Sequence, residues 1–181
     1  MSRILLFISF LMLSFSAVSQ KYSPVDEESK VNFKIKNFGI NTGGDFSGLT
    51  GDIIFIPGNM TNCSFDVSVK VNTIDTDNDK RDSHLKSEDY FNAEKYPLIN
   101  IKSTRINKAK AASGKFIFTG TISMHGISKS IVFPFTATKK GEDYLFAGEF
   151  QINRLDFDVG KNSSVLSNTV KISLSVLAKK S

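Results

Sequence analysis

The sequence predicts an all-β protein built around one antiparallel sheet, and three observations support this prediction. Apolar and polar residues alternate with a period of two along most of the 181-residue chain, as in strands that bury one face. Clusters of glycine, proline, asparagine and serine separate the alternating runs and predict turns. No change in composition and no internal repeat divides the chain, so the eight or nine expected strands form one domain.

The first residues of the chain have the composition of a cleaved signal peptide. Arg3 gives a basic start, Ile4–Phe15 is almost wholly apolar, and Ala17-Val18-Ser19 supplies the small residues that signal peptidase reads. The apolar run is shorter than the roughly 20 residues of a membrane-spanning helix. We therefore expect residues 1–19 to be removed, leaving a single soluble periplasmic domain over residues 20–181.

Four alternating runs define the faces of the expected strands. The residues expected to be buried are Phe33 and Ile35; Cys63, Phe65, Val67, Val69 and Val71; Tyr144, Phe146, Gly148, Phe150 and Ile152; and Val170, Ile172, Leu174 and Val176. Polar residues stand between them. Strands that are wet on one face and apolar on the other are typical of antiparallel sheets.

Turns are expected where small and polar residues cluster. The clusters are Gly43-Gly44, Gly48–Gly51, Pro57-Gly58-Asn59, Ala112-Ser113-Gly114, His125-Gly126 and Lys140-Gly141-Glu142. The long runs Phe116–Met124 and Ile131–Ala137 flank His125-Gly126. We expect a tight hairpin there, because glycine adopts the positive φ that such turns require.

The stretch from Ile74 to Ile99 interrupts the β pattern with charged residues. Its aspartates favour the N-terminus of a helix, so we expect one short helix that carries His84 and Leu85 and caps one end of a barrel. The same aspartates do not form an EF-hand, since Lys80 and Lys86 occupy the positions that need glycine and glutamate.

A sheet of this many strands can form a sandwich or close into a barrel, and a barrel removes exposed edges. Thirteen phenylalanines and no tryptophan remain after residue 19, mostly on the apolar faces. The alternation itself leaves open whether they fill the interior or line a hollow one. The only cysteine, Cys63, excludes an internal disulfide and is expected to be a buried, inert thiol.

Several classes of function find no support in the sequence. Removal of Arg3 would leave 22 basic and 18 acidic residues, and the lysines are scattered singly, so we expect no nucleic-acid binding. Weak, transient contact with an anionic membrane surface stays open. The two histidines and one cysteine are too few for a metal site, and no nucleophile elbow or phosphate-binding loop is present. We expect no metal, no cofactor and no catalytic residue.

Four blocks of the sequence, in order, resemble the YceI-like family of secreted bacterial proteins. They are Phe46–Gly51 with Ile53–Pro57; Arg81–Leu85 with Ser87–Phe91 and Tyr96-Pro97; Gly120–Lys129; and Arg154–Phe157 with Val170–Ala178. The resemblance covers nearly all of residues 21–178. It departs at Asp158, where the family pattern has glycine.

The resemblance implies an eight-stranded, lipocalin-like antiparallel β-barrel with a short helical insert and a hollow apolar interior. The implied function is non-enzymatic binding of a polyisoprenoid or similar long lipid, for transport, storage or sequestration. The expected cavity wall consists of Phe33, Phe46, Phe65, Val67, Val69, Phe91, Phe116, Phe118, Phe133, Phe135, Phe146 and Phe150. The expected head-group contacts are Asp75, Arg81, Asp82 and His84.

Two other functions remain open at this point. A ligand-free barrel could act as an interaction module in envelope stress, and an enzyme could act on a lipid held in the same interior. The resemblance also leaves homodimer formation open.

Overall fold

A computed structural model describes residues 20–109 and 114–181 of the chain, so the expected signal peptide and most of the expected turn at 112–114 lie outside the described residues. The strands are β1 (Lys21–Pro24), β2 (Lys30–Asn37), β3 (Ile40–Phe46), β4 (Thr50–Ile54), β5 (Ser64–Lys70), β6 (Leu98–Lys108), β7 (Lys115–Met124), β8 (Ile127–Lys140), β9 (Asp143–Asn153) and β10 (Leu166–Lys180). The helix is α1 (Asp79–Lys86), and the 3₁₀ turns are η1 (Asp26–Glu28), η2 (Met60–Asn62), η3 (Val71–Thr73) and η4 (Arg154–Phe157).

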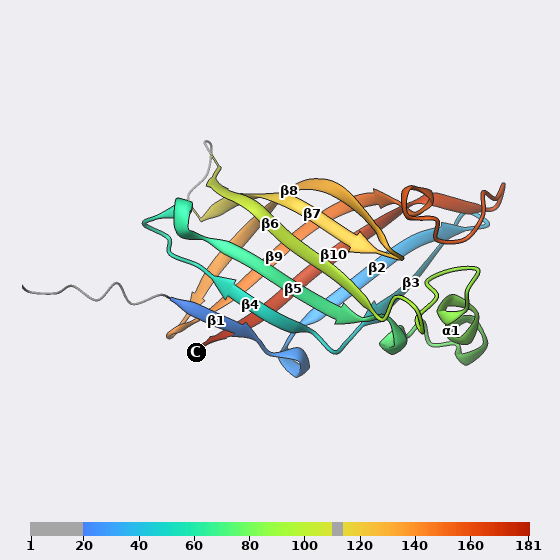
Figure 1. Cartoon of the computed structure of the whole chain (residues 1–181), viewed down its shortest axis with the longest axis horizontal. Coiled ribbons are helices and arrows are strands. Elements are labelled where there is room, and N and C mark those ends of the chain that lie inside the picture. The colour runs from blue at the N-terminus through green and yellow to red at the C-terminus, as the bar shows by residue number, and fades with distance from the viewer. Residues whose placement is uncertain (1–19, 110–113) are drawn as a thin grey trace, which may run out of the picture.

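The strands form a closed antiparallel barrel (Figure 1). Its ring has the order β1-β4-β5-β6-β7-β8-β9-β10, and pairing between β1 and β10 closes it. Strands β2 and β3 extend the sheet beyond β10, which gives ten strands in place of the predicted eight or nine. The predicted eight-stranded barrel with one short helical insert is confirmed, since the ring contains eight strands.

The two extra strands exist because the first hairpin of the barrel is interrupted. β1 and β2 both pair with β10 and are separated by the η1 turn, while residues 47–49 separate β3 from β4. The Asp26 carboxylate joins the two breaks by accepting hydrogen bonds from the backbone N–H groups of Gly48 and Leu49, each at 2.8 Å. Both strands of the hairpin are therefore interrupted at the same height along the barrel. Beyond this point β2 and β3 lie outside the ring of eight strands.

The predicted turn at Gly43-Gly44 is wrong, because both glycines lie inside β3. A Cβ at Gly44 would stand 2.4 Å from the carbonyl oxygen of Asp75, so the missing side chain lets β3 approach the segment before α1. The turn of this hairpin is instead Phe38-Gly39, where φ is +49° and +78°.

The predicted hairpin at His125-Gly126 is confirmed, with φ of +51° and +77° at the two central residues. Its second strand starts at Ile127, four residues before the expected apolar run. The helix that carries His84 and Leu85 is also confirmed. However, its N-cap is Asn78, whose side chain accepts a hydrogen bond from Arg81 N at 3.0 Å, and not one of the aspartates.

One end of the barrel is packed with aromatic rings. Phe55 is fully buried at its centre, and four other rings contact it nearly edge-on, with centroids 5.1–6.3 Å away. Those four rings belong to Phe65, Phe116, Tyr144 and Phe146. Above them Phe133 stacks between Phe118 and Phe150, at 4.8 and 4.6 Å. This half of the interior is filled, as in an ordinary protein core.

The single cysteine belongs to this same packed end. The Cys63 thiol is buried, and its burial raises its pKa above the ordinary value of a cysteine, while a hydrogen bond with the Ile56 backbone opposes the shift. The thiol therefore stays protonated, and its predicted burial is confirmed. Among the described residues, no helix is both long enough and apolar enough to cross a membrane.

The packed end makes a testable prediction about stability. Phe55→Ala should cost about 3–5 kcal/mol of unfolding free energy, since it leaves a void among the four rings that contact Phe55. Phe33→Ala should cost clearly less, because Phe33 already borders open space at the other end of the barrel. Equilibrium urea unfolding of both variants measures the difference, and equal losses would contradict the division into a filled and a hollow half.

Candidate functional site

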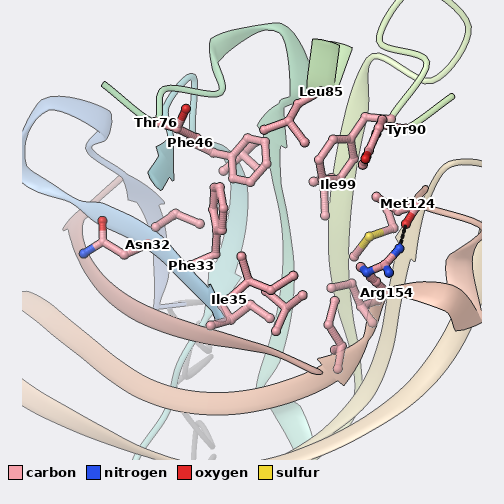
Figure 2. Close-up of a pocket in the computed structure, with 18 of the residues that line it drawn as sticks. Asn32, Phe33, Ile35, Phe46, Thr76, Leu85, Tyr90, Ile99, Met124 and Arg154 are labelled. Carbon is pink, nitrogen blue, oxygen red and sulfur yellow. Dashed lines mark hydrogen bonds between the residues drawn. The ribbon is translucent and has the colours of Figure 1, made fainter. Parts of the chain in front are cut away.

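The other half of the barrel contains a cavity of about 270 Å³. Its wall comes from strands β2, β3, β5, β6, β7, β9 and β10 and from the segment around α1. Figure 2 shows Phe33, Phe46 and Ile35 on one side, with Ile99 and Met124 facing them. Leu85 and Tyr90, from the segment around α1, line the cavity at the top of this view.

The structure divides the expected wall residues into two groups. Six of them line the cavity, namely Phe33, Phe46, Val67, Val69, Phe91 and Phe150. The other six do not line it, namely Phe65, Phe116, Phe118, Phe133, Phe135 and Phe146. These six residues were expected in the cavity wall but lie at the filled end of the barrel. They face inward there, and neighbouring rings occupy the space beside them.

The cavity has a wall that strands do not build. β4 pairs with β5, but β3 pairs with β5 at no described residue. A gap therefore separates β3 from β5 in this half of the barrel. The backbones of Asp45 and Asp75 bridge this gap with two hydrogen bonds, of 2.9 and 3.1 Å. The segment that follows Asp75 fills the rest, with Phe91 packed edge-on against Phe46 at 5.8 Å.

A small polar network fixes this segment over the cavity. Arg81 Nε donates to the Thr76 hydroxyl at 2.8 Å, and its Nη2 donates to the Thr76 carbonyl oxygen. The Thr76 hydroxyl in turn donates to the carboxylate of Asp82, which is 7% exposed. Thr76 and Arg81 line the cavity, whereas Asp82 lies behind them. The Asp82 carboxylate thus offsets part of the Arg81 charge.

The other two expected head-group residues lie in different places. His84 lines the cavity, and its ring contacts Tyr90 edge-on at 4.8 Å. Asp75 does not line the cavity, because its carboxylate turns back to accept a hydrogen bond from Asp77 N at 2.8 Å. Of the four expected contacts, the structure therefore brings Arg81 and His84 to the cavity, and Asp75 and Asp82 are corrected to positions outside its lining.

His125 also has a contact that the sequence did not reveal. Its Nδ1 lies 3.0 Å from the carbonyl oxygen of Phe157, and its ring packs edge-on against Tyr96 at 4.9 Å. It therefore connects the β7–β8 hairpin to η4 and to the segment after α1.

The most informative residue of the lining is Arg154, which the sequence did not single out as a site residue. It is only 4% exposed and lies in η4, directly after β9. Its guanidinium donates to the carbonyl oxygens of Ser167, Val159 and Lys161 and to Asn168 Oδ1, at 2.8–3.0 Å. These contacts use four of its five N–H groups. The fifth, on Nη1, has no acceptor among the described residues.

The lining carries an excess of positive charge. Arg81 and Arg154 line the cavity, and none of the described lining residues is an aspartate or glutamate. Burial lowers the pKa of the Arg154 guanidinium, and the neighbouring Tyr90 raises it. An arginine remains charged under such conditions. A neutral or anionic acceptor group in the cavity would therefore find a donor, and a cation would be repelled.

Outside the lining, acidic groups gather where β3 meets the segment before α1. Burial raises the pKa of Asp45, and the charges of Asp75 and Asp77 raise it further.

In the part of the chain that the structure describes, no group of three or more histidine, cysteine, aspartate or glutamate side chains is arranged to hold a metal ion. The chemistry that this arrangement offers is the enclosure of an apolar chain beside hydrogen-bond donors.

Comparison with known proteins agrees with this geometry. Protein YceI of Salmonella agona (strain SL483) is 27% identical over 180 residues, which span 94% of this chain and 92% of that protein. The crystal structure of Burkholderia cenocepacia BcnA superimposes with a TM-score of 0.81 at 24% identity, over 86% of this chain and 99% of that one.

A second solved structure is a polyisoprenoid binding domain from Saccharophagus degradans, implicated in plant cell wall breakdown. It has a TM-score of 0.71 at 15% identity and covers 88% of this chain and 98% of its own. At these identities the two structures show a shared fold.

The family model described as the YceI-like domain matches residues 22–178, which is almost the whole described barrel. The chain therefore belongs to the YceI-like domain family.

Proposed function

We propose that this protein binds an amphiphile, without chemical conversion, by enclosing one end of its apolar chain in the cavity beside α1. The observation that carries this proposal is a 270 Å³ space with an apolar wall and, among the described lining residues, no acidic group. The structural neighbour from Saccharophagus degradans, a polyisoprenoid binding domain, favours a prenyl chain as the ligand.

The filled end of the barrel limits how much of a long chain is enclosed. An apolar cavity of about 150 Å³ holds a benzene molecule, so 270 Å³ holds on the order of ten carbon atoms. Burial of these carbons contributes roughly 8 kcal/mol before the costs of association are subtracted. Carbons beyond this number extend through the mouth, where they contact the rim. Selectivity should therefore depend on girth more than on total length.

The donors of the lining favour a particular head group. Arg81 lies in α1, within the segment that covers the cavity, and Arg154 also lines the cavity with four of its five N–H groups already used. Acceptor-only groups such as a carboxylate, a phosphate or a quinone oxygen match these donors, whereas an ammonium head does not.

The proposal includes export, because residues 1–19 have the features of a signal peptide. An exported barrel with one partly enclosed chain would carry, store or sequester its ligand in an aqueous compartment. Binding is favoured over catalysis because the lining joins an apolar wall to donors that are held by hydrogen bonds to backbone carbonyls and to Thr76.

The first prediction for this function concerns the cavity volume. Ile172, on β10, lines the cavity, so Ile172→Phe should fill it and weaken binding of the prenyl alcohol farnesol by at least about tenfold. The stability of the free protein should change little, since the added ring occupies existing space. Ligand-dependent thermal shifts measure the affinity. Val132→Phe, on the outer face of β8, is the control; unchanged binding by Ile172→Phe would refute the enclosed site.

The second prediction concerns the head group. Arg81→Gln should weaken binding of a fatty acid by about tenfold, because a charge-assisted hydrogen bond is lost. Binding of the fatty alcohol with the same chain should stay nearly constant, which separates the head group from the cavity wall. Isothermal titration with both ligands measures the ratio, and the exposed Lys70→Gln serves as control. An equal loss for both ligands would contradict a role in head-group binding.

The third prediction concerns export. Protein recovered from its own host should begin at Gln20 and occur in the soluble periplasmic or secreted fraction. Intact-mass analysis of that fraction measures the start of the chain. A membrane-bound protein that retains residues 1–19 would contradict the proposed cleavage.

A further inference from the structure

The tip of the β2–β3 hairpin has an unusual composition for its geometry. Its two central residues, Phe38 and Gly39, both have positive φ, which is the geometry of a type I′ turn. Such turns favour Asn-Gly or Asp-Gly, and a bulky side chain at positive φ is strained. Phe38 is also 73% exposed, so packing within the chain does not compensate for this strain.

Two further large apolar side chains lie beside Phe38. Ile40, the first residue of β3, is 71% exposed, and Val165 is exposed in the loop before β10. The Phe38 N–H donates to the Val165 carbonyl oxygen at 2.9 Å, which holds the hairpin tip against this loop. These three residues are called the apolar tip. The other large exposed hydrophobics among the described residues, Leu98 and Val132, stand on β6 and β8.

The apolar tip continues the wall of the cavity beyond its rim. Asn37 lines the cavity and pairs directly with Ile40, and directly paired residues share one face of a sheet. Leu166, next to Val165, also lines the cavity and pairs with Asn37. Figure 1 shows the end of β2 beside the loop before β10, at the same end of the barrel as α1. The apolar tip thus lies directly beyond two residues of the cavity lining, Asn37 and Leu166.

The charges nearest to the apolar tip along the chain are basic. Lys36 is exposed two residues before Phe38, and in the loop that contains Val165 the exposed Lys161 lies nearer to Val165 than the exposed Asp158 does. The acidic pair at Asp45 and Asp75 is five residues along β3 from Ile40, or about 16 Å. That separation exceeds the Debye length of about 10 Å at moderate salt, so its repulsion is largely screened at the tip.

We propose that the apolar tip inserts into the interfacial region of a bilayer that contains anionic phospholipids. Three side chains are too few for a stable protein interface, whereas apolar groups flanked by lysines are what a membrane surface binds. Insertion would bring the end of the barrel that carries α1 and the cavity to the membrane surface. Docking itself does not depend on the proposed ligand, but transfer of a lipid between membrane and cavity rests on the proposed function.

The test measures co-sedimentation of the purified protein with vesicles of phosphatidylcholine that contain phosphatidylglycerol. Phe38→Asn should reduce vesicle binding by about tenfold, because the phenylalanine that inserts into the bilayer is replaced by a polar side chain. Its melting temperature should stay the same or rise, because Asn-Gly suits this turn. Val132→Thr is the matched control, since Val132 is 64% exposed on β8, and it should bind as the wild type does.

Each of several results would overturn the proposal. These are no binding of the wild type at low salt, equal loss in Phe38→Asn and Val132→Thr, or equal binding to vesicles without anionic lipid. A large drop in the melting temperature of Phe38→Asn would assign Phe38 to folding, and a dimer that disappears in this variant would assign the tip to a second copy of the chain. Farnesol binding should be unchanged in Phe38→Asn, so failure of docking and failure of cavity binding are distinguishable.

Discussion

The double pairing of β10 is the constraint on which the rest of the structure depends. One edge of this long strand pairs with β9, and the other pairs first with β2 and then with β1. Between these two partners, Leu177 pairs with a residue of neither β2 nor β1. Its backbone N–H donates to Ser29 Oγ at 3.1 Å, and its carbonyl oxygen accepts from Val25 N at 2.8 Å. Both backbone groups of Leu177 are thus satisfied, which stabilises the interruption.

The contrast between the two ends of the barrel follows from this break. On the β1 side the short strands close the ring tightly, and the aromatic rings around Phe55 fill its interior. On the β2 side, β3 does not pair with β5, so the strands alone do not enclose the interior. The segment around α1 supplies the missing part of the wall. A single chain therefore contains both a core and a cavity, with Phe150 at the boundary, since it stacks on Phe133 and lines the cavity.

Local periodicity and turn residues predicted the strands, the helix and the inward faces, whereas the closed barrel was implied by the resemblance to the YceI-like family. The sequence could not distinguish Phe33 from Phe116, since both alternate correctly and only their level along the barrel axis separates hollow from filled. That level depends on the register of strands far apart in the chain. Arg154 was missed for a related reason: its acceptors lie five to fourteen residues away, two in the loop before β10 and two at the start of β10, and no periodic pattern connects them. The one available signal was a lone arginine at the end of an apolar run.

The weakest part of the cavity wall is the contact between β3 and the segment before α1. Neighbouring strands of the ring share whole ladders, such as the ten residue pairs between β7 and β8, whereas Asp45 and Asp75 form a single bridge. Like charges further weaken this contact, because Asp75 and Asp77 oppose ionisation of Asp45. Local opening generally occurs where contacts are few and exposed. Local opening of the described wall should therefore begin at this bridge, while the pairing between β1 and β10 keeps the barrel closed.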